Sequence, residues 1–245
     1  MLINGGLIAR QEKLPIFGAS FDGTNDYLAR GAGLTGAADG KLGIFACKFK
    51  MLGGDGVTQR LASNRTTALG ARFNIDRGSD NLILLRGTDT GGTLNMFIKN
   101  TTAITADGNY HTLLASWDIG TDDNHMYLDD ASEISVTTSD NTNIDHTVGN
   151  FGIGADVDPI GNKLNADVNV MYLNIAEKID LSVTANRRKF FDVNGNWVPS
   201  RYDGGQEPTG NQPIIYIPGT YRSFSANHGT GGGFIVTGAF TEPAS

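Results

Sequence analysis

Apolar residues alternate most densely along residues 166–175, and this pattern predicts a long β-strand. Both faces of the strand are apolar, with Val168, Val170 and Tyr172 on one and Met171, Leu173 and Ile175 on the other. Such a strand is covered on both sides, so we expect it at the centre of a sheet. It leads into a predicted short helix at residues 181–191, for which Ser182 or Asp180 is the expected N-cap.

A strict period of two marks residues 43–51, where Phe45, Cys47, Phe49 and Met51 alternate with two lysines. This pattern predicts a half-buried strand. Similar runs predict strands at residues 60–64, 71–75, 82–85, 94–98, 110–117, 125–129, 132–137, 151–154, 214–217 and 234–237. The 33 glycines among 245 residues follow no collagen-like period and punctuate turns between these runs. The pattern predicts an all-β protein built as a two-sheet antiparallel sandwich.

The composition changes after Trp197, where a turn-rich stretch precedes the last two predicted strands. We therefore expect a sandwich domain at residues 1–198 and a strand-bearing C-terminal extension at residues 199–245. A segment of this length is too short to form a core of its own. The extension is expected to pack on the sandwich or to extend from it.

The formal net charge of −7 argues against a nucleic-acid or anionic-membrane partner, since either requires a basic surface. The densest basic run, Arg187 to Lys189, is predicted to solvate the exposed face of the helix. The N-terminus lacks a basic region followed by an apolar run, so no signal peptide is expected, and no apolar run is long enough for membrane insertion. Cys47 is the single cysteine, so packing and not disulfides must stabilise the fold.

Calcium is the metal that the sequence best accommodates, because oxygen-rich loops are its physical requirement. Asp118, Asp122 and Asp123 provide one such loop, and Asp156 with Asp158 provides another. The alternative is a solvated acidic loop without metal, which we favour, so no cofactor is expected. The four histidines are scattered and lack the close spacing of a zinc site.

No catalytic set stands out in the sequence, and we expect a protein that is not an enzyme. A glycosidase needs two carboxylates held across the scissile bond. The nearest sets, Asp129-Asp130 with Glu133 and Glu177 with Asp180, span a predicted turn and a strand-to-helix connection. Trp197 is the candidate for ligand binding, as a ring on which a sugar could stack, whereas Trp117 follows a core pattern.

Five segments in order resemble the concanavalin A-like, laminin G-like jelly roll. They are residues 21–28, 43–50, 108–118, 126–130 and, at the end, 151–154 with the long strand and Leu181-Ser182. The chain departs from the family pattern at Tyr110, where Trp is usual, and at Asp130-Ala131, where Asp-Gly is usual. The resemblance covers residues 19–191 and implies a jelly-roll fold. It does not imply a particular ligand, because one fold hosts many functions.

The C-terminal segment, residues 213–240, is similar to that of laminin G-like proteins of tailed phages. This resemblance implies a non-enzymatic virion protein, either a capsid decoration or a tail- or fibre-associated attachment protein, made in the host cytoplasm. Its expected partners are other virion proteins or host surface glycan, and a homo-oligomer is expected. The alternatives are a free carbohydrate-binding lectin and a degenerate glycoside hydrolase.

Overall fold

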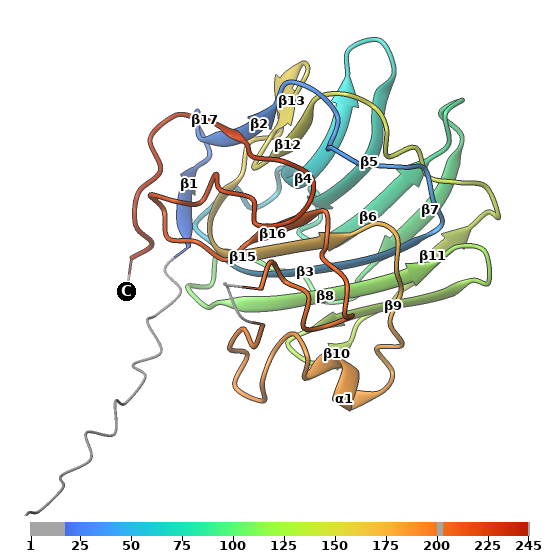
Figure 1. Cartoon of the computed structure of the whole chain (residues 1–245). Helices are drawn as coiled ribbons and strands as arrows, with labels where there is room; N and C mark the ends of the chain where they lie inside the picture. Colours follow the sequence, from blue (N-terminus) through green and yellow to red (C-terminus); the bar gives the residue numbers. More distant parts are fainter. Residues whose placement is uncertain (1–17, 200–202, 245) are drawn as a thin grey trace, which may run out of the picture.

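Two antiparallel sheets face each other across a hydrophobic core in the computed structural model, which describes residues 18–199 and 203–244 (Figure 1). The N-terminal stretch used to argue against a signal peptide lies outside the described residues. The all-β jelly-roll sandwich predicted from the sequence is confirmed. No helix in the described part of the chain is long and apolar enough to cross a bilayer.

The first sheet has the order β1-β15-β3-β8-β9-β10, and β16 pairs with β15 beyond the end of β1. Its strands are β1 (Ala19–Asp22), β15 (Asn165–Asn174), β3 (Leu42–Met51), β8 (His111–Asp118), β9 (Asp123–Leu128), β10 (Ala131–Ser132) and β16 (Ile215–Ile217). We call this sheet A. The long strand is central in it, as predicted, because β3 lies on one side and β1 and β16 share the other.

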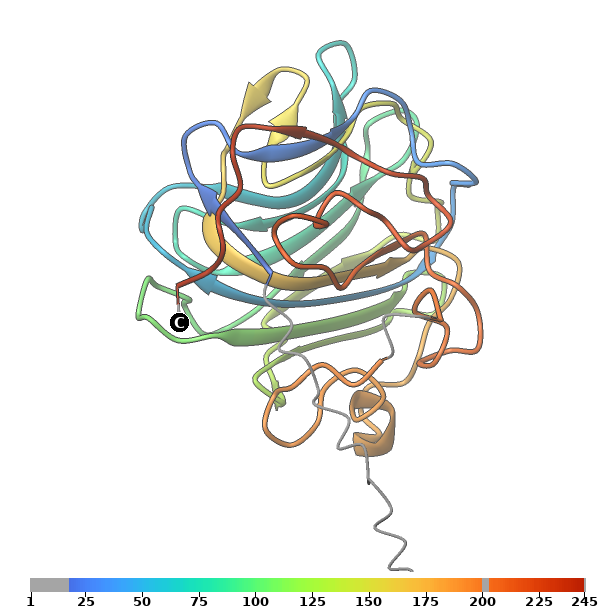
Figure 2. The same ribbon diagram turned by 60° about the vertical axis from the view of Figure 1, so that its left-hand side comes forward.

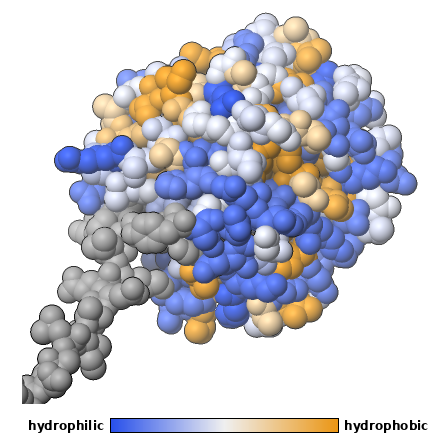
Figure 3. Space-filling view, viewed as in Figure 1, coloured by the Kyte–Doolittle hydropathy of each residue, from blue (hydrophilic) through white to orange (hydrophobic). Residues whose placement is uncertain are grey.

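The second sheet, sheet B, has the order β11-β7-β6-β5-β4-β12-β2-β17. Its strands are β11 (Val136–Ser139), β7 (Leu94–Lys99), β6 (Ile83–Thr88), β5 (Gly70–Arg77), β4 (Gln59–Thr66), β12 (Phe151–Ile153), β2 (Tyr27–Arg30) and β17 (Ile235–Thr237). A small hairpin, β13 (Asp156–Val157) and β14 (Ile160–Gly161), lies in the stretch predicted to be a loop. The C-terminal segment adds one strand to each sheet, and hydrophobic surface gathers around β17 (Figures 2 and 3).

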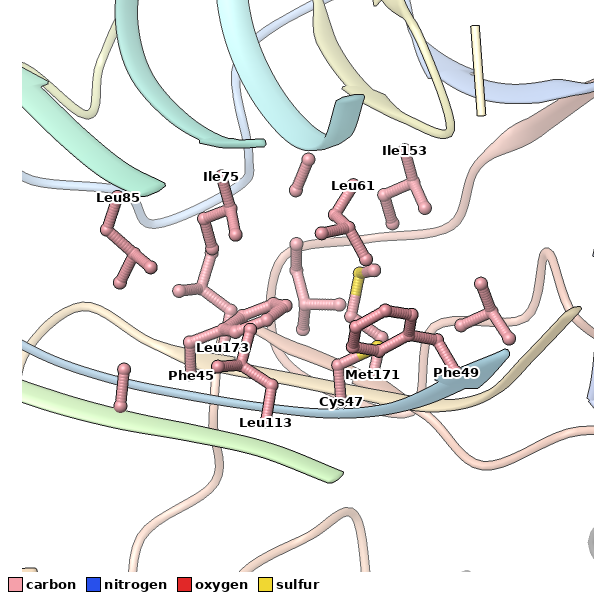
Figure 4. Close-up of a cluster of buried hydrophobic side chains, with 14 of the residues drawn as sticks. Phe45, Cys47, Phe49, Leu61, Ile75, Leu85, Leu113, Ile153, Met171 and Leu173 are labelled. Atoms are coloured by element: carbon pink, nitrogen blue, oxygen red, sulfur yellow. The ribbon is translucent and has the colours of Figure 1, made fainter. Parts of the chain in front are cut away.

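The main core fills the space between the sheets, and its labelled side chains point toward one another from both (Figure 4). The inward set predicted for β3 is confirmed, since Phe45, Cys47, Phe49 and Met51 are all at most 1% exposed. Their neighbours Lys48 and Lys50 point outward, because successive side chains of a strand alternate between its faces. The predicted strand at residues 132–137 is instead two strands, and the chain passes there from sheet A to sheet B.

A β-bulge at Asn169 changes the predicted faces of β15. The pairing with β3 shifts between Val168, which is opposite Phe49, and Val170, which is opposite Lys48. The extra residue moves Val168 into the main core, while Val170 and Tyr172 point out of the sandwich. The prediction that these three side chains share one face was therefore wrong, because alternation assumes an uninterrupted ladder.

The segment after β15, residues 176–199, folds over the outer face of sheet A, and we call it the covering segment (Figure 1). It forms a second hydrophobic cluster with the sheet. The covering segment supplies Leu181, Phe190, Phe191 and Trp197, and the sheet supplies Ile44, Ala46, Leu114, Val170, Tyr172 and Tyr216. The structure thus has two cores, one between the sheets and one outside sheet A.

The helix in the covering segment, α1 (Thr184–Arg187), is shorter than predicted. Its N-cap is Val183, and no side chain caps it. The carboxylate of Asp180 accepts instead from the amide and hydroxyl of Ser182, so neither predicted cap is used. The helix buries no side chain, while Leu181 and Phe190 on either side of it are fully buried, so packing stabilises the flanks rather than the helix.

Candidate functional site

A pocket of about 200 Å³ opens where the covering segment meets the outer face of sheet A. Strands β3, β8 and β9 form its floor, and residues 187–195 form its opposite wall. It is lined by Lys48, Tyr110, Thr112, Leu114, Tyr127, Asp129, Asp130, Arg187, Arg188, Phe191, Asp192, Val193, Asn194 and Gly195. The lining combines aromatic rings with side chains of both charges.

Strand alternation places the floor residues on the outer face. Lys48 follows the buried Cys47 on β3, Thr112 is opposite Lys48 on β8, and Tyr127 is opposite Leu114 on β9. The tyrosine ring is covered by the guanidinium of Arg187, which lies 4.4 Å from the ring centroid. The interpretation of Arg187 as a solvated surface residue was therefore wrong, because cation–π contact with Tyr127 holds it in the pocket.

Two aspartates make the turn between β9 and β10, and both have left-handed backbones. The φ angle is 49° at Asp129 and 68° at Asp130. This geometry fits a two-residue hairpin turn, for which glycine or asparagine is the usual choice at these positions. The glycine of the family pattern is thus replaced by Asp130, and not by Ala131 as the sequence indicated. Its carboxylate accepts from Arg187 Nε at 2.6 Å and from Arg188 at 2.5 Å, which ties the covering segment to the turn.

Asp129, which lines the pocket, pairs with His111 on β8. His111 Nδ1 lies 2.7 Å from its Oδ2 atom, and the Thr112 amide donates to its Oδ1 atom. This hydrogen bond raises the pKa of His111 above its ordinary value, against the effect of burial. Burial raises the pKa of Asp129, but the hydrogen bonds from His111 and Thr112 outweigh it and hold this pKa below its ordinary value.

Lys48 connects the floor to the wall. Its Nζ atom donates to the carbonyl of Gly195 at 2.8 Å, which leaves two of its three N–H groups for other acceptors. Burial lowers the pKa of Lys48, although Asp192 and Asp129 oppose this effect. Gly195 has φ of 70°, and a Cβ atom there would lie 3.3 Å from the Thr112 methyl group. The wall loop can therefore approach the sheet closely.

Trp197 is not available as the sugar-stacking ring predicted from the sequence. It is 4% exposed, its ring packs against Phe191 with centroids 5.2 Å apart, and its Nε1 donates to Tyr216 Oη at 3.1 Å. The sequence did not reveal the burial of Trp197, because two of its ring partners, Tyr172 and Tyr216, come from the distant strands β15 and β16. Its function is to hold the covering segment on sheet A.

The three aspartates of the predicted calcium loop do not form one ligand set. Asp118 accepts from the Gly120 amide and the Thr121 hydroxyl, and Asp122 accepts from Asn124 Nδ2. Asp123 lies against His125 and Lys178. In the ranges that the structure covers, no three His, Cys, Asp or Glu side chains are grouped as a metal site.

The second acidic loop is part of a buried ion network. Asp156 is 1% exposed and accepts from Arg60 Nε and an outer nitrogen of the same guanidinium, at 2.9 and 3.0 Å. Ser63 and Asn162 also donate to it. These bonds connect the β13–β14 hairpin to sheet B. They give both oxygens of the Asp156 carboxylate hydrogen-bond donors from the protein itself.

The carboxylate sets considered for catalysis are separated. Glu133 accepts from Thr101 and Thr102, outside the lining of the pocket, while Asp129 and Asp130 belong to the pocket. Glu177 accepts from Asn174 Nδ2 at 2.7 Å.

The sequence did not single out the pocket residues as a site. Tyr127 carries a signal that could have been found, since an aromatic side chain stands on the outward face of a strand that needs only its inward face buried. Lys48 and Gly195 carry none, because they meet only when the covering segment folds back over β3.

The sequence matches no protein-family model and no curated protein. Solved structures with a similar fold include a Bacteroides ovatus protein described as a "putative carbohydrate binding protein", with a TM-score of 0.50, 9% identity, and 68% of this chain and 46% of that chain covered. The heptameric SAP-like pentraxin from Limulus polyphemus has a TM-score of 0.49 and 16% identity, with 69% and 80% covered. The CBM40 module of a Ruminococcus gnavus sialidase, bound to α2,3 sialyllactose, has a TM-score of 0.47 and 13% identity, with 69% and 95% covered. At these identities the likeness is one of fold, a two-sheet jelly-roll sandwich.

Proposed function

We propose that this protein is a carbohydrate-binding module and that the pocket between the covering segment and sheet A is its binding site. The observation that carries the proposal is the lining of the pocket, which places unused Lys48 donors, the carboxylates of Asp129 and Asp130, and aromatic rings within one hollow. The Bacteroides protein, whose description names carbohydrate binding, supports it through the shared fold alone.

The chemistry of the lining suits a polyhydroxylated ligand. A sugar hydroxyl donates one hydrogen bond and accepts others, so it can use a lysine donor and a carboxylate acceptor together. Its C–H faces need apolar contact, which the rings of Tyr110 and Phe191 in the lining offer. Asp130 keeps its left-handed backbone although glycine would be unstrained there, as expected where a side chain is needed.

We propose further that binding is not followed by catalysis. Each carboxylate near the pocket is held by cationic or backbone donors, and Asp129 is held ionised by His111 and Thr112. A general acid would require a carboxyl whose pKa is raised. Incubation with β-glucans is expected to release no reducing sugar.

Binding of the purified full chain to a glycan array tests the proposal, with Lys48→Gln and Asp129→Asn as pocket variants. Lys99→Gln is the matched control, because Lys99 lies on sheet B and pairs with Asp80. We expect the pocket variants to lose at least tenfold in affinity for a glycan that the control binds normally. Failure of the wild type to bind any arrayed glycan would overturn the proposal, as would full affinity in Lys48→Gln.

The sequence resemblance of residues 213–240 supports a finer proposal, in which the module belongs to a tailed-phage virion and attaches it to host surface glycan or to other virion proteins. It predicts that the chain is found by mass spectrometry in purified phage particles. It also predicts a homo-oligomer in solution, measurable by light scattering. A monomer absent from particles would leave a free lectin as the alternative.

A further inference from the structure

The outer face of sheet A is divided into two halves of different character. Apolar side chains of the covering segment pack on one half, around Tyr172. The other half carries Lys48 and Lys50 on β3 and Asp167 and Asn169 on β15, and we call these four residues the polar strip. Lys48 belongs both to the strip and to the lining of the pocket, so the two are continuous.

Two parts of the chain border the polar strip. The Gly195 carbonyl accepts from Lys48 Nζ at 2.8 Å on the side of the pocket, and the Ala244 carbonyl accepts from Lys50 Nζ at 3.2 Å near the C-terminal end. The strip therefore lies between the wall loop and residues 241–244. Tyr110 stands beside it, with Lys50 Nζ 4.8 Å from its ring centroid.

The carboxylate of Asp167 is only partly satisfied. Its Oδ2 atom pairs with Lys50 Nζ at 2.9 Å and lies 3.5 Å from the Tyr110 hydroxyl. Its Oδ1 atom has no hydrogen-bond partner among the residues that the structure describes, although the side chain is 1% exposed. A buried carboxylate oxygen without a donor is costly, so a donor from outside the described chain would stabilise it.

Asn169 presents a second oxygen of this kind. Its Oδ1 atom is buried and has no hydrogen-bond partner within residues 18–199 and 203–244. It is the extra residue of the β15 bulge, and bulges re-aim side chains next to binding sites. Two unsatisfied acceptors thus lie on one strand beside the polar end of the pocket.

We infer that the glycan site continues from the pocket across β3 to β15, where Asp167 and Asn169 accept hydroxyl groups of a second sugar unit. The inference rests on the proposed function and narrows the ligand to an oligosaccharide. From β9 to β15 the site crosses three strand spacings, about 14 Å at the usual separation of strands. That length accommodates a chain of about two or three pyranose units and exceeds one.

A length series tests this inference by calorimetric titration of the full chain with cello-, malto- and chito-oligosaccharides of one to six units. For the series that binds, we expect affinity to rise at least tenfold from the monosaccharide to the trisaccharide and then to level off. Asn169→Ala is expected to abolish this rise and to leave monosaccharide affinity unchanged, since the asparagine lies outside the pocket lining. Asp167→Asn, which keeps the side-chain shape, is expected to reduce the rise in the same way.

Thr137→Ala, on the exposed β11 of sheet B, is the matched control and should keep the full rise. Equal affinity for the mono- and trisaccharide would overturn the inference and leave the proposed function standing. A full rise in Asn169→Ala, with a wild-type melting curve, would also overturn it. If none of the series binds and the glycan array is also negative, the proposed function fails with it.

Discussion

Replacing Trp197 by alanine separates a structural role from a ligand-binding role for this residue. The indole is 4% exposed and packs against Tyr172, Phe190, Phe191 and Tyr216, with ring centroids 5.2 to 6.3 Å apart. If the ring joins the covering segment to sheet A, its removal lowers the free energy of unfolding. If it were a sugar platform, its removal would lower glycan affinity alone.

The expected loss is about 3 to 5 kcal/mol, the usual cost of truncating a buried tryptophan to alanine. Part of it comes from the lost hydrogen bond between Nε1 and Tyr216 Oη, worth about 1 kcal/mol. For a chain of this length, such a loss lowers Tm by about 6 to 20 °C. Trp197→Phe keeps an aromatic ring and should lose about 1 to 2 kcal/mol, mainly through the missing donor.

Urea denaturation followed by tryptophan fluorescence and circular dichroism measures both variants against the wild type. Trp117 remains in each variant as a buried fluorophore. The reasoning is refuted if Trp197→Ala unfolds within 1 kcal/mol of the wild type. It is also refuted if Trp197→Phe keeps its stability and loses glycan affinity, because that pattern belongs to a stacking platform.

Three further predictions concern pH, the β9–β10 turn and calcium. Burial lowers the pKa of His146 from 6.5 to about 4, so the fold holds this side chain neutral. The resulting stabilisation is complete above pH 6.5, and the free energy of unfolding falls by about 3 kcal/mol as the pH falls to 4. Denaturation at both pH values should show this loss in the wild type and not in His146→Leu. Asp130→Gly should change the free energy of unfolding by less than about 1 kcal/mol, since relief of backbone strain offsets the loss of two exposed ion pairs. It should nevertheless weaken glycan binding at least tenfold, because Arg187 and Arg188 lose their common partner. Unchanged affinity would contradict a role of Asp130 in shaping the pocket. Millimolar calcium should not shift Tm, because the aspartates of residues 118–123 each have other partners; a rise of several degrees would establish a calcium site.

Local patterns predicted the strands well wherever one ladder runs without interruption. In β3, the alternation of four buried side chains with two outward lysines required only the period of two. In β15 the same rule placed Val168 on the wrong face, because the bulge at Asn169 depends on pairing with β3, more than a hundred residues away. Helix length failed for a related reason, since the buried residues Leu181 and Phe190 lie outside α1.

The candidate site could not be assembled from local patterns. The sequence pointed to Trp197 and to the aspartates near residue 120, because these residues look free when only their neighbours in the chain are considered. In the structure Trp197 is buried, and the aspartates have other partners, among them Lys178 of the covering segment. The pocket instead joins β3, β8 and β9 to residues 187–195, and its contacts span up to 147 positions, as between Lys48 and Gly195.

The sequence by itself determined the all-β class, the antiparallel two-sheet sandwich and the central place of residues 166–175. These features follow from short-range alternation and turn residues, which act within a few positions of the chain. The tertiary structure alone decided which outward face is covered, where the bulge re-aims β15 and which polar side chains meet. Those outcomes depend on packing between distant segments, since the covering segment buries an apolar half of sheet A and leaves the polar half beside the pocket.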